Sequence, residues 1–352
     1  MLRPDKHAYR RCLSGVIVLL TMLTGCSSNR LRNAPPTIEP AQPAMSPPVA
    51  QTPTGMVRPL GGGPQAALYD SGIRKLVVLS AGAEPLAPAR ITVFGDAQTP
   101  PRVIALPGPA TALSCDDHGT GYVAARGGYF AVDLSGGGIA YIRVAGAAGT
   151  DFTAIARRAD GKLVLGSADG AVYILAAATA DAAATAEVAN RNKMFARVDA
   201  VVTQGNTSVV LDRGQTSVTA IGADGRAEQA LRAGLGATTL AADPLGRVLV
   251  ADTRGGQLLV YGVGPLMLRQ AYPVRQAPYG LAGSGELAWV SQTASNMVIG
   301  YDLSTGIPVE KVRYPTVQQP NSLAFDEASG TLYVVSASGA GVQVIEHAAV
   351  AH

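Results

Sequence analysis

The chain has 352 residues, of which 15% are charged and 47% hydrophobic, and it contains 41 glycines and 23 prolines. So many glycines and prolines argue against a helical bundle, and the hydrophobic content excludes a disordered chain. The formal net charge is +3, and residues 1–25 alone carry +3, so the rest of the chain is neutral. A neutral body argues against nucleic acid as a partner, because binding to phosphates needs a basic excess.

Residues 1–25 are typical of a lipoprotein signal peptide. A positive segment from Arg3 to Arg11 precedes an apolar run from Leu13 to Leu23, which is too short to cross a bilayer. The run ends in Leu23-Thr24-Gly25-Cys26, which resembles the lipobox of bacterial lipoproteins. The resemblance implies cleavage before Cys26 and lipidation of its thiol, which would anchor the chain to the extracytoplasmic face of the cell membrane. An ordinary signal peptide with a chance cysteine is the alternative, and the export route stays open.

The mature chain is expected to consist of a tether and one folded domain. Residues 26–64 are polar and rich in proline, which favours an extended spacer, so we expect the lipidated cysteine to be followed by a disordered tether. Residues 65–352 then form the domain. Cys115 is the only cysteine beyond Cys26, so this domain can form no internal disulfide.

The domain is built from repeats of 40–45 residues. Each unit holds three short apolar stretches separated by turns, as in residues 239–262, and a fourth apolar stretch such as Arg102 to Leu106. The units begin near Ala66, Thr111, Thr153, Val198, Thr238, Tyr279 and Asn321. Such units are typical of propeller blades, so the sequence predicts an all-β, seven-bladed β-propeller with four-stranded blades. The outermost strand of the last blade either comes from Met56 to Leu60 or is absent.

Two units resemble known repeat families. Residues 249–261 look like an NHL repeat, and residues 287–306 look like a YVTN-type repeat. With its lipobox, its proline-rich segment and 23 arginines against five lysines, the chain resembles actinobacterial envelope lipoproteins, in particular mycobacterial lipoproteins of the LppL kind. The resemblance implies a propeller and says little about function, because one fold supports many functions.

The sequence contains no recognisable catalytic motif. It has neither a Gly-x-Ser-x-Gly elbow nor a phosphate-binding loop, and His118 is the one histidine well inside the repeat region. His118 belongs to the run Cys115-Asp116-Asp117-His118, whose residue types suit a metal ion. Asp116 also occupies a turn position that recurs as aspartate in other units. A metal site and a turn beside a buried thiol are therefore the two interpretations of this run.

The mouth of the central channel is the better candidate for a binding site, because the inner strands of all blades converge there. Polar residues interrupt the small apolar pattern at the starts of three inner strands, at Asp151, Asp199 and Asn321. Their oxygens suit Ca²⁺, and lactonase-type six-bladed propellers hold a catalytic Ca²⁺ in this place. The alternative is that these side chains cap turns or face water in the channel.

These observations predict a lipid-anchored, extracytoplasmic protein whose propeller is a binding or scaffold module of the cell envelope. No catalytic residue and no obligatory cofactor are assigned. The partner would be an envelope protein or a small molecule. The alternative function is a Ca²⁺-dependent hydrolase or lactonase-like enzyme with its site at the channel mouth.

Overall fold

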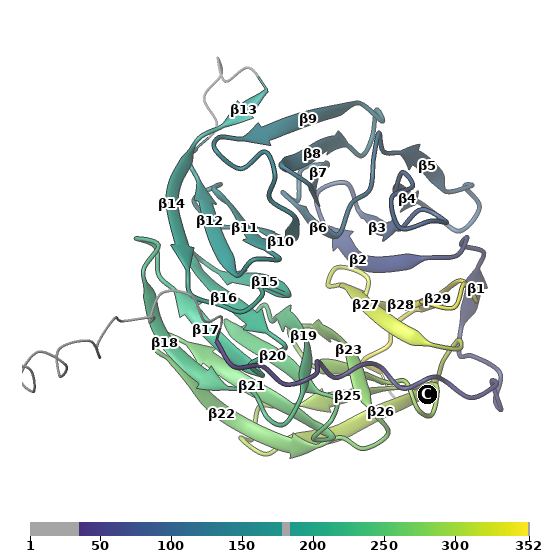
Figure 1. Cartoon of the computed structure of the whole chain (residues 1–352). Helices are drawn as coiled ribbons and strands as arrows, with labels where there is room; N and C mark the ends of the chain where they lie inside the picture. The colour runs from purple at the N-terminus through teal and green to yellow at the C-terminus, as the bar shows by residue number, and fades with distance from the viewer. Residues whose placement is uncertain (1–34, 178–183, 351–352) are drawn as a thin grey trace, which may run out of the picture. The chain divides into compact units, whose positions relative to one another are not determined.

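The computed structural model describes residues 35–177 and 184–350, and the chain from Pro35 onward forms one compact unit. Every regular element in these residues is a β-strand, and the strands form seven blades arranged in a ring (Figure 1). The predicted seven-bladed propeller is confirmed. In the described part of the chain, no helix has the length and apolar character needed to span a membrane. The signal segment 1–25 and Cys26 lie outside the described residues.

The first four blades each have four consecutive antiparallel strands, with one short addition. Blade one contains β2 (Pro64–Asp70), β3 (Lys75–Ser80), β4 (Arg90–Phe94) and β5 (Arg102–Ala105). Blade two contains β6 (Ala112–Cys115), β7 (Thr120–Ala125), β8 (Gly128–Asp133) and β9 (Ile139–Val144), and β13 (Thr185–Ala186) pairs in parallel with β9. Blade three contains β10 (Phe152–Arg157), β11 (Leu163–Ser167), β12 (Ala171–Leu175) and β14 (Val188–Lys193). Blade four contains β15 (Ala200–Gln204), β16 (Thr207–Asp212), β17 (Ser217–Ile221) and β18 (Ala227–Arg232).

The last three blades complete the ring. Blade five contains β19 (Ala237–Ala242), β20 (Arg247–Asp252), β21 (Gln257–Val263) and β22 (Leu266–Pro273). Blade six contains β23 (Pro278–Gly283), β24 (Ala288–Gln292), β25 (Met297–Asp302) and β26 (Val309–Pro315). Blade seven contains β27 (Pro320–Asp326), β28 (Thr331–Ser336), β29 (Val342–Ile345) and the N-terminal strand β1 (Met56–Arg58).

The N-terminal strand closes the ring. β1 pairs antiparallel with β29, with Val57 opposite Gln343, and so supplies the outermost strand of blade seven. This confirms the first of the two alternatives for the last blade. Since blade seven combines the two ends of the repeat region, the ring can open at this blade only if β1 separates from β29. Pro59 follows β1 directly, where a missing N–H costs no ladder hydrogen bond.

The hydrophobic core is divided among the junctions between blades. Seven clusters of buried apolar side chains occur in the described residues, and each joins two neighbouring blades. The cluster of Leu76, Val78, Val335 and Val342 joins blade one to blade seven. A sheet has two faces to cover, and a closed ring covers both by stacking each blade between two others. The axis of the ring is therefore left without a core of its own.

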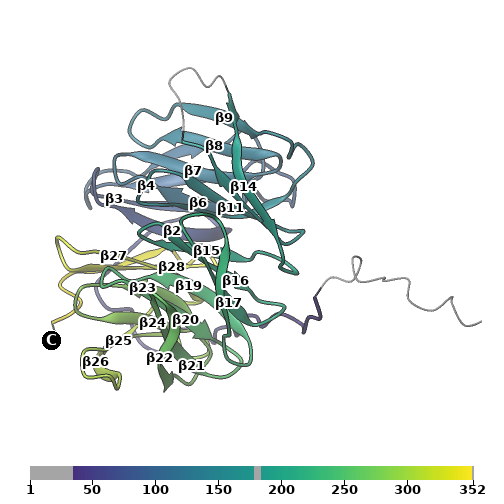
Figure 2. The ribbon, with the colours of Figure 1, turned by 90° about the vertical axis from the view of Figure 1, so that its left-hand side faces the viewer.

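A segment that precedes β1 lies along one face of the ring. Residues 37–48, called the strap below, run past the turns of blades four, five and six (dark purple in Figures 1 and 2). The expected tether extended to residue 64, whereas Pro35 and all that follows belong to the compact unit. Hydrogen bonds to the ring hold this segment in place. Its prolines have no backbone N–H, and side chains of the ring accept hydrogen bonds from several of the N–H groups that the other residues supply.

Candidate binding face at the channel mouth

A cavity of about 760 Å³ lies on the axis of the ring. The inner strands of all seven blades line it, which is the arrangement that the repeats predict. Ligand pockets in proteins usually measure about 300–1,000 Å³, so the cavity is large enough for a small molecule or a peptide side chain. The cavity is therefore a candidate binding site by size and position.

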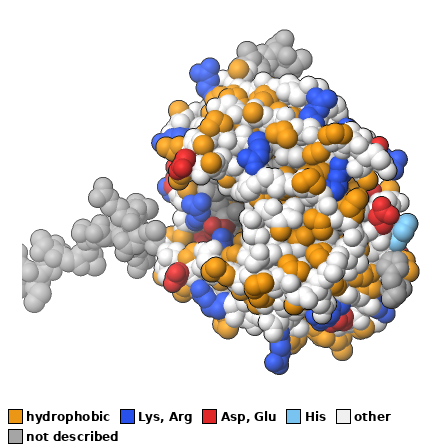
Figure 3. All heavy atoms as spheres, turned by 90° about the vertical axis from the view of Figure 1, so that its right-hand side faces the viewer, with side chains coloured by type: hydrophobic (Ala, Val, Ile, Leu, Met, Phe, Trp, Pro, Cys, Tyr) orange, Lys and Arg blue, Asp and Glu red, His pale blue; other side chains and the backbone are white. Residues whose placement is uncertain are grey.

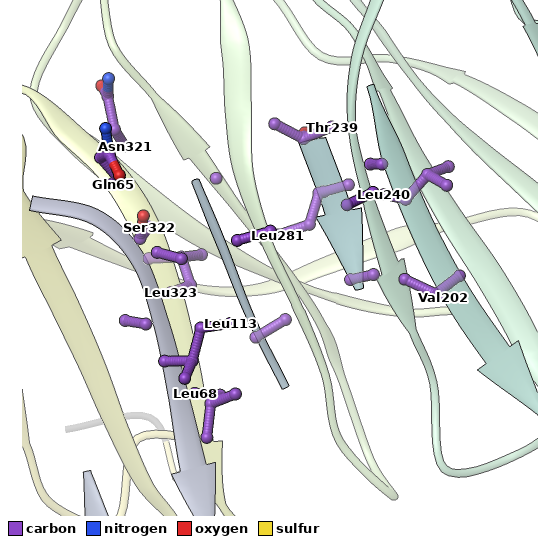
Figure 4. A pocket seen from close by; sticks show the side chains of 18 of the residues that line it. Gln65, Leu68, Leu113, Val202, Thr239, Leu240, Leu281, Asn321, Ser322 and Leu323 are labelled. Atoms are coloured by element: carbon purple, nitrogen blue, oxygen red, sulfur yellow. The ribbon is translucent and has the colours of Figure 1, made fainter. Parts of the chain in front are cut away.

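The lining is polar at one end and aliphatic further along. Figure 4 shows Gln65 and Asn321 close together at one end, with Leu68 and Leu113 deeper in the cavity. Each blade contributes an aliphatic side chain to the lining, namely Leu68, Leu113, Ile155, Val202, Leu240, Leu281 and Leu323. Among the described residues of the lining, the charged side chains are those of Asp199 and Arg213. The groups that can orient a ligand are thus gathered at the mouth.

Asp199 lies at the mouth, directly before β15, and its carboxylate is already bonded on both oxygens. Oδ2 accepts a hydrogen bond from the backbone N–H of Arg213 at 2.8 Å, and Oδ1 accepts one from Nε of Arg197 at 3.1 Å. Burial raises the pKa of the Asp199 carboxyl. The prediction that Asp199 is at the channel mouth agrees with the cavity lining, and its contacts give it a structural role in the β16–β17 turn.

Asn321 lines the cavity from β27, on another blade. Its Oδ1 accepts a hydrogen bond from Nε2 of Gln319 at 3.0 Å. Asp151 differs from both, since it is not among the residues that line the cavity. Its side chain is 57% exposed and forms an ion pair with Arg126 at 3.1 Å. The structure therefore brings two of the three predicted residues to the cavity.

The described residues contain no group of three or more His, Cys, Asp or Glu side chains that could hold a metal ion. Cys115, Asp116 and His118 instead form the turn between β6 and β7. Asp116 Oδ1 accepts hydrogen bonds from the backbone N–H groups of His118 and Thr120, each at 2.9 Å. Asp70 Oδ1 bonds the N–H groups of the equivalent turn in blade one, at 3.0 and 3.1 Å. These contacts favour the turn interpretation of this run, because short polar side chains stabilise turns by bonding nearby backbone N–H groups.

The Cys115 thiol is expected to be unreactive in the folded protein. Burial raises its pKa to about 12, and the negative charge of Asp117, whose Oδ1 lies 3.8 Å from Sγ, acts in the same direction. Because the thiolate is the reactive form, alkylation of Cys115 at pH 8 should be slower by roughly fiftyfold than that of an ordinary cysteine, since the thiolate fraction falls more than the nucleophilicity rises. Peptide mass spectrometry after iodoacetamide treatment measures this rate separately from those of Cys12 and Cys26. Rapid labelling without denaturant would contradict the burial, whereas labelling in urea should be fast.

Two arginines of the ring bind the first half of the strap. Arg254 Nη2 donates to the carbonyl of Glu39 at 2.7 Å, and Arg213 donates to the carbonyl of Ala41. The N–H of Ile38 donates to the carbonyl of Gly214 at 2.8 Å. Arg213 also lines the cavity. The strap therefore borders the channel mouth at Arg213, whose backbone N–H donates to Asp199.

Gln319 binds the second half of the strap with both ends of its amide. Its Oε1 accepts from the N–H of Ser46 at 3.0 Å, and its Nε2 donates to the carbonyl of Ala44 at 2.9 Å. Thr293 Oγ1 accepts from the N–H of Ala44 at 3.1 Å, and Asn296 Nδ2 donates to the carbonyl of Pro47 at 2.8 Å. Since Gln319 also bonds Asn321, both channel-mouth residues are linked to residues that hold the strap.

No sequence pattern singles out Arg213, Arg254, Asn296 or Gln319. They lie in turns and connections of one face, called the strap face below, which comprises residues 213–216, 253–256, 293–296 and 316–319. Polar residues are ordinary in turns, so composition does not distinguish them. Two glycines are the one feature of the sequence that relates to the strap. A Cβ at Gly214 would lie 3.0 Å from Thr37, and a Cβ at Gly236 would lie 2.9 Å from the Cβ of Ala41.

The side of the ring at blades one and seven is mixed in character. Figure 3, which views the side of the ring at blades one and seven, shows basic, acidic and hydrophobic side chains scattered among one another. A surface of this kind offers no single-signed field that would steer a charged polymer. The strap face is therefore set apart by its hydrogen bonds to an extended segment and by the adjoining cavity, more than by charge.

Comparison with known proteins supports the fold. No protein-family model and no curated protein sequence matches the chain. Among solved structures, a streptogramin B lyase superposes with a TM-score of 0.65 at 12% identity, covering 84% of this chain and 96% of the other. A chain of a mitotic checkpoint complex gives 0.69 at 12% identity (88% and 99% covered), and a hydrazine synthase of Kuenenia stuttgartiensis gives 0.64 at 14% (83% and 98%). At such low identity the likeness is one of fold alone.

Proposed function

We propose that this chain is a lipid-anchored, extracytoplasmic binding module that holds its partner on the strap face of the propeller. The observation that carries the proposal is the gathering of hydrogen-bonding side chains from blades four, five and six and the connection to blade seven around the strap, beside the axial cavity that one of them, Arg213, also lines. Polar groups that converge beside an apolar cavity are the usual composition of a binding site. The partner is an envelope protein or a small molecule of the envelope.

The proposed anchor is the Cys26 thiol. Two or three acyl chains hold a protein on a membrane stably, whereas without them only the neutral surface of this protein would contact the lipid. Replacing Cys26 with alanine should move the protein from the membrane fraction to the soluble fraction and abolish the mass of the lipid on the N-terminal peptide. The Cys115→Ala variant is the matched control and should stay in the membrane fraction. Retention of the Cys26→Ala protein in the membrane would contradict the anchor.

The competing function is a Ca²⁺-dependent hydrolase or lactonase at the same mouth. Asp199 and Asn321 both line the cavity, but each already has a protein partner, and Ca²⁺ usually takes six to eight oxygens. A ligand that binds only the folded state raises its unfolding temperature. A binding module that needs no metal should unfold at the same temperature in EDTA and in millimolar Ca²⁺. A rise in Ca²⁺ would favour the hydrolase and direct the search to lactones and esters.

A further inference from the structure

The strap is recognised almost entirely through its main chain. The ring bonds the N–H groups of Ile38, Ala44 and Ser46 and the carbonyls of Glu39, Ala41, Ala44, Ser46 and Pro47. Ser46 adds a side-chain contact, since its Oγ donates to the carbonyl of Thr293 at 2.6 Å and accepts from the N–H of Gln319 at 3.0 Å. A surface that bonds backbone groups selects for an extended chain and reads few side chains.

The strap has the composition of a polyproline II segment. Prolines stand at positions 40, 43, 47 and 48, and no residue of the strap is in a strand or helix. Extended proline-rich peptides have no internal hydrogen bonds, so their carbonyls are free to accept from a partner, and little conformational entropy is lost when they bind. The ring supplies the matching donors from the side chains of Arg213, Arg254, Asn296 and Gln319. The ring thus holds the strap as a binding surface holds an extended peptide, by donors that meet its carbonyls.

The strap also fits into space that the ring leaves open. Ala41 is 6% exposed, and its Cβ packs over Gly236, where an added Cβ would lie 2.7 Å from the Cβ of Arg254 and 2.9 Å from that of Ala41. Thr37 uses the space above Gly214 in the same way. The segment after the strap is held less, because residues 49–52 are exposed and make none of the hydrogen bonds to the ring that the strap makes, before the N–H of Thr54 donates to the carbonyl of Pro315 at 3.1 Å. This places a weakly held connection between the strap and the strand that closes the ring.

We propose that the strap face is a peptide-binding groove for extended, proline-rich segments, that residues 37–48 occupy it in cis, and that it takes a proline-rich segment of a partner protein when the strap leaves. This inference rests on the proposed function, because it names the class of partner for the same face. The strap competes with such a partner, since a segment joined to its groove by a short linker acts at an effective concentration in the millimolar range.

The first test measures whether the strap leaves the ring by itself. Amide hydrogen exchange of the full chain should show the N–H groups of Ile38, Ala44 and Ser46 exchanging at least about a hundredfold faster than that of buried Val250 in β20. Adding a synthetic peptide of residues 35–50 should speed the exchange of the strap and leave Val250 unchanged. Exchange of the strap at the rate of Val250, insensitive to the peptide, would overturn the proposal, because the strap would then be a fixed part of the fold.

The second test measures binding in trans. The variant Ala41→Glu with Ser46→Pro keeps the groove intact, but it puts a charge at a buried position of the strap and removes the N–H and hydroxyl that bond Gln319 and Thr293. It should bind the fluorescent 35–50 peptide about tenfold or more tightly than the unaltered chain does, because cis competition is gone. Adding Arg254→Ala should weaken peptide binding about fivefold, whereas Arg226→Ala, an exposed arginine on a turn of the opposite face, should not.

Absence of peptide binding by the folded double variant would overturn the groove. If that variant does not fold, the exchange experiment on the unaltered chain still decides the question. Both measurements are made on purified protein without a membrane or a cellular partner. Their failure would therefore remove the proline-rich class of partner, while the anchored binding module would still stand or fall by experiments in cells.

Discussion

Replacing Trp289 with alanine is expected to lower the free energy of unfolding by about 4 kcal/mol, a loss near the upper end for a single core truncation. Trp289 is fully buried in β24 and stacks on Phe325 of blade seven, with ring centroids 5.8 Å apart. Its cluster joins blades six and seven, so the alanine leaves a cavity at a junction of the ring. Because strands on both sides are fixed by their own ladders, the junction can collapse only in part.

Urea unfolding measures this loss. It is followed by circular dichroism, because the variant lacks the only tryptophan of the sequence and its fluorescence cannot be used. Trp289→Phe is the informative companion. The indole N–H of Trp289 has no hydrogen-bond partner, so phenylalanine removes an unsatisfied donor together with some contact area, and it should cost less than about 1.5 kcal/mol. Leu245→Ala, at an exposed turn, should change stability by less than about 0.5 kcal/mol. A cost for Trp289→Ala near that of Leu245→Ala would mean that blades six and seven are not packed together.

Replacing Arg58 with alanine is expected to cost about 3 kcal/mol, because Arg58 ties the closing strand to the next blade. It is 9% exposed, and it donates from Nη1 to the carbonyl of Gly95 at 2.7 Å and from Nη2 to that of Thr99 at 2.8 Å. Its guanidinium also lies 5.0 Å from the centroid of the Phe94 ring. These groups of blade one lose their partner in the alanine variant, at the one junction where the two ends of the repeat region meet.

Chemical unfolding of Arg58→Ala should therefore begin at lower denaturant, and limited proteolysis should cut first near β1. Arg58→Lys keeps the charge and loses the two-pronged geometry, so its cost should fall between that of alanine and zero. Arg102→Ala is the matched control, because Arg102 is exposed and makes one long contact with the carbonyl of Gly136 at 3.3 Å. Equal losses of unfolding free energy for Arg58→Ala and Arg102→Ala would show that Arg58 does not hold β1 against blade one.

The sequence was sufficient to predict the ring. Aspartates such as Asp70 and Asp243 recur at turns between short apolar runs, and the structure shows their carboxylates bonding the backbone N–H groups of those turns. The small residues expected on the inner strands, such as Ala66 and Ala241, line the axial cavity. These features depend on local pattern and repetition, which a sequence displays directly.

The sequence could not predict the strap or all of the channel mouth. A proline-rich segment looks the same whether it is a free spacer or a bound peptide, because the ring bonds its main chain. Asp151 and Asp199 both precede an inner strand, yet Asp199 lines the cavity and Asp151 turns to Arg126. That difference depends on the local conformation of two connections, and period-two alternation within strands does not determine it.

The central claim is that the partner binds on the strap face, and site-specific photo-crosslinking in intact cells tests it most directly. Leu235 borders the strap face, next to Gly236 on which Ala41 of the strap packs, and is 57% exposed, whereas Leu245 lies in the β19–β20 turn on the opposite face and is 60% exposed. A photoreactive phenylalanine derivative would be placed at one position or the other. The proposal predicts a discrete adduct from position 235 and none from position 245. Adducts from position 245 alone, or from neither position, would contradict it.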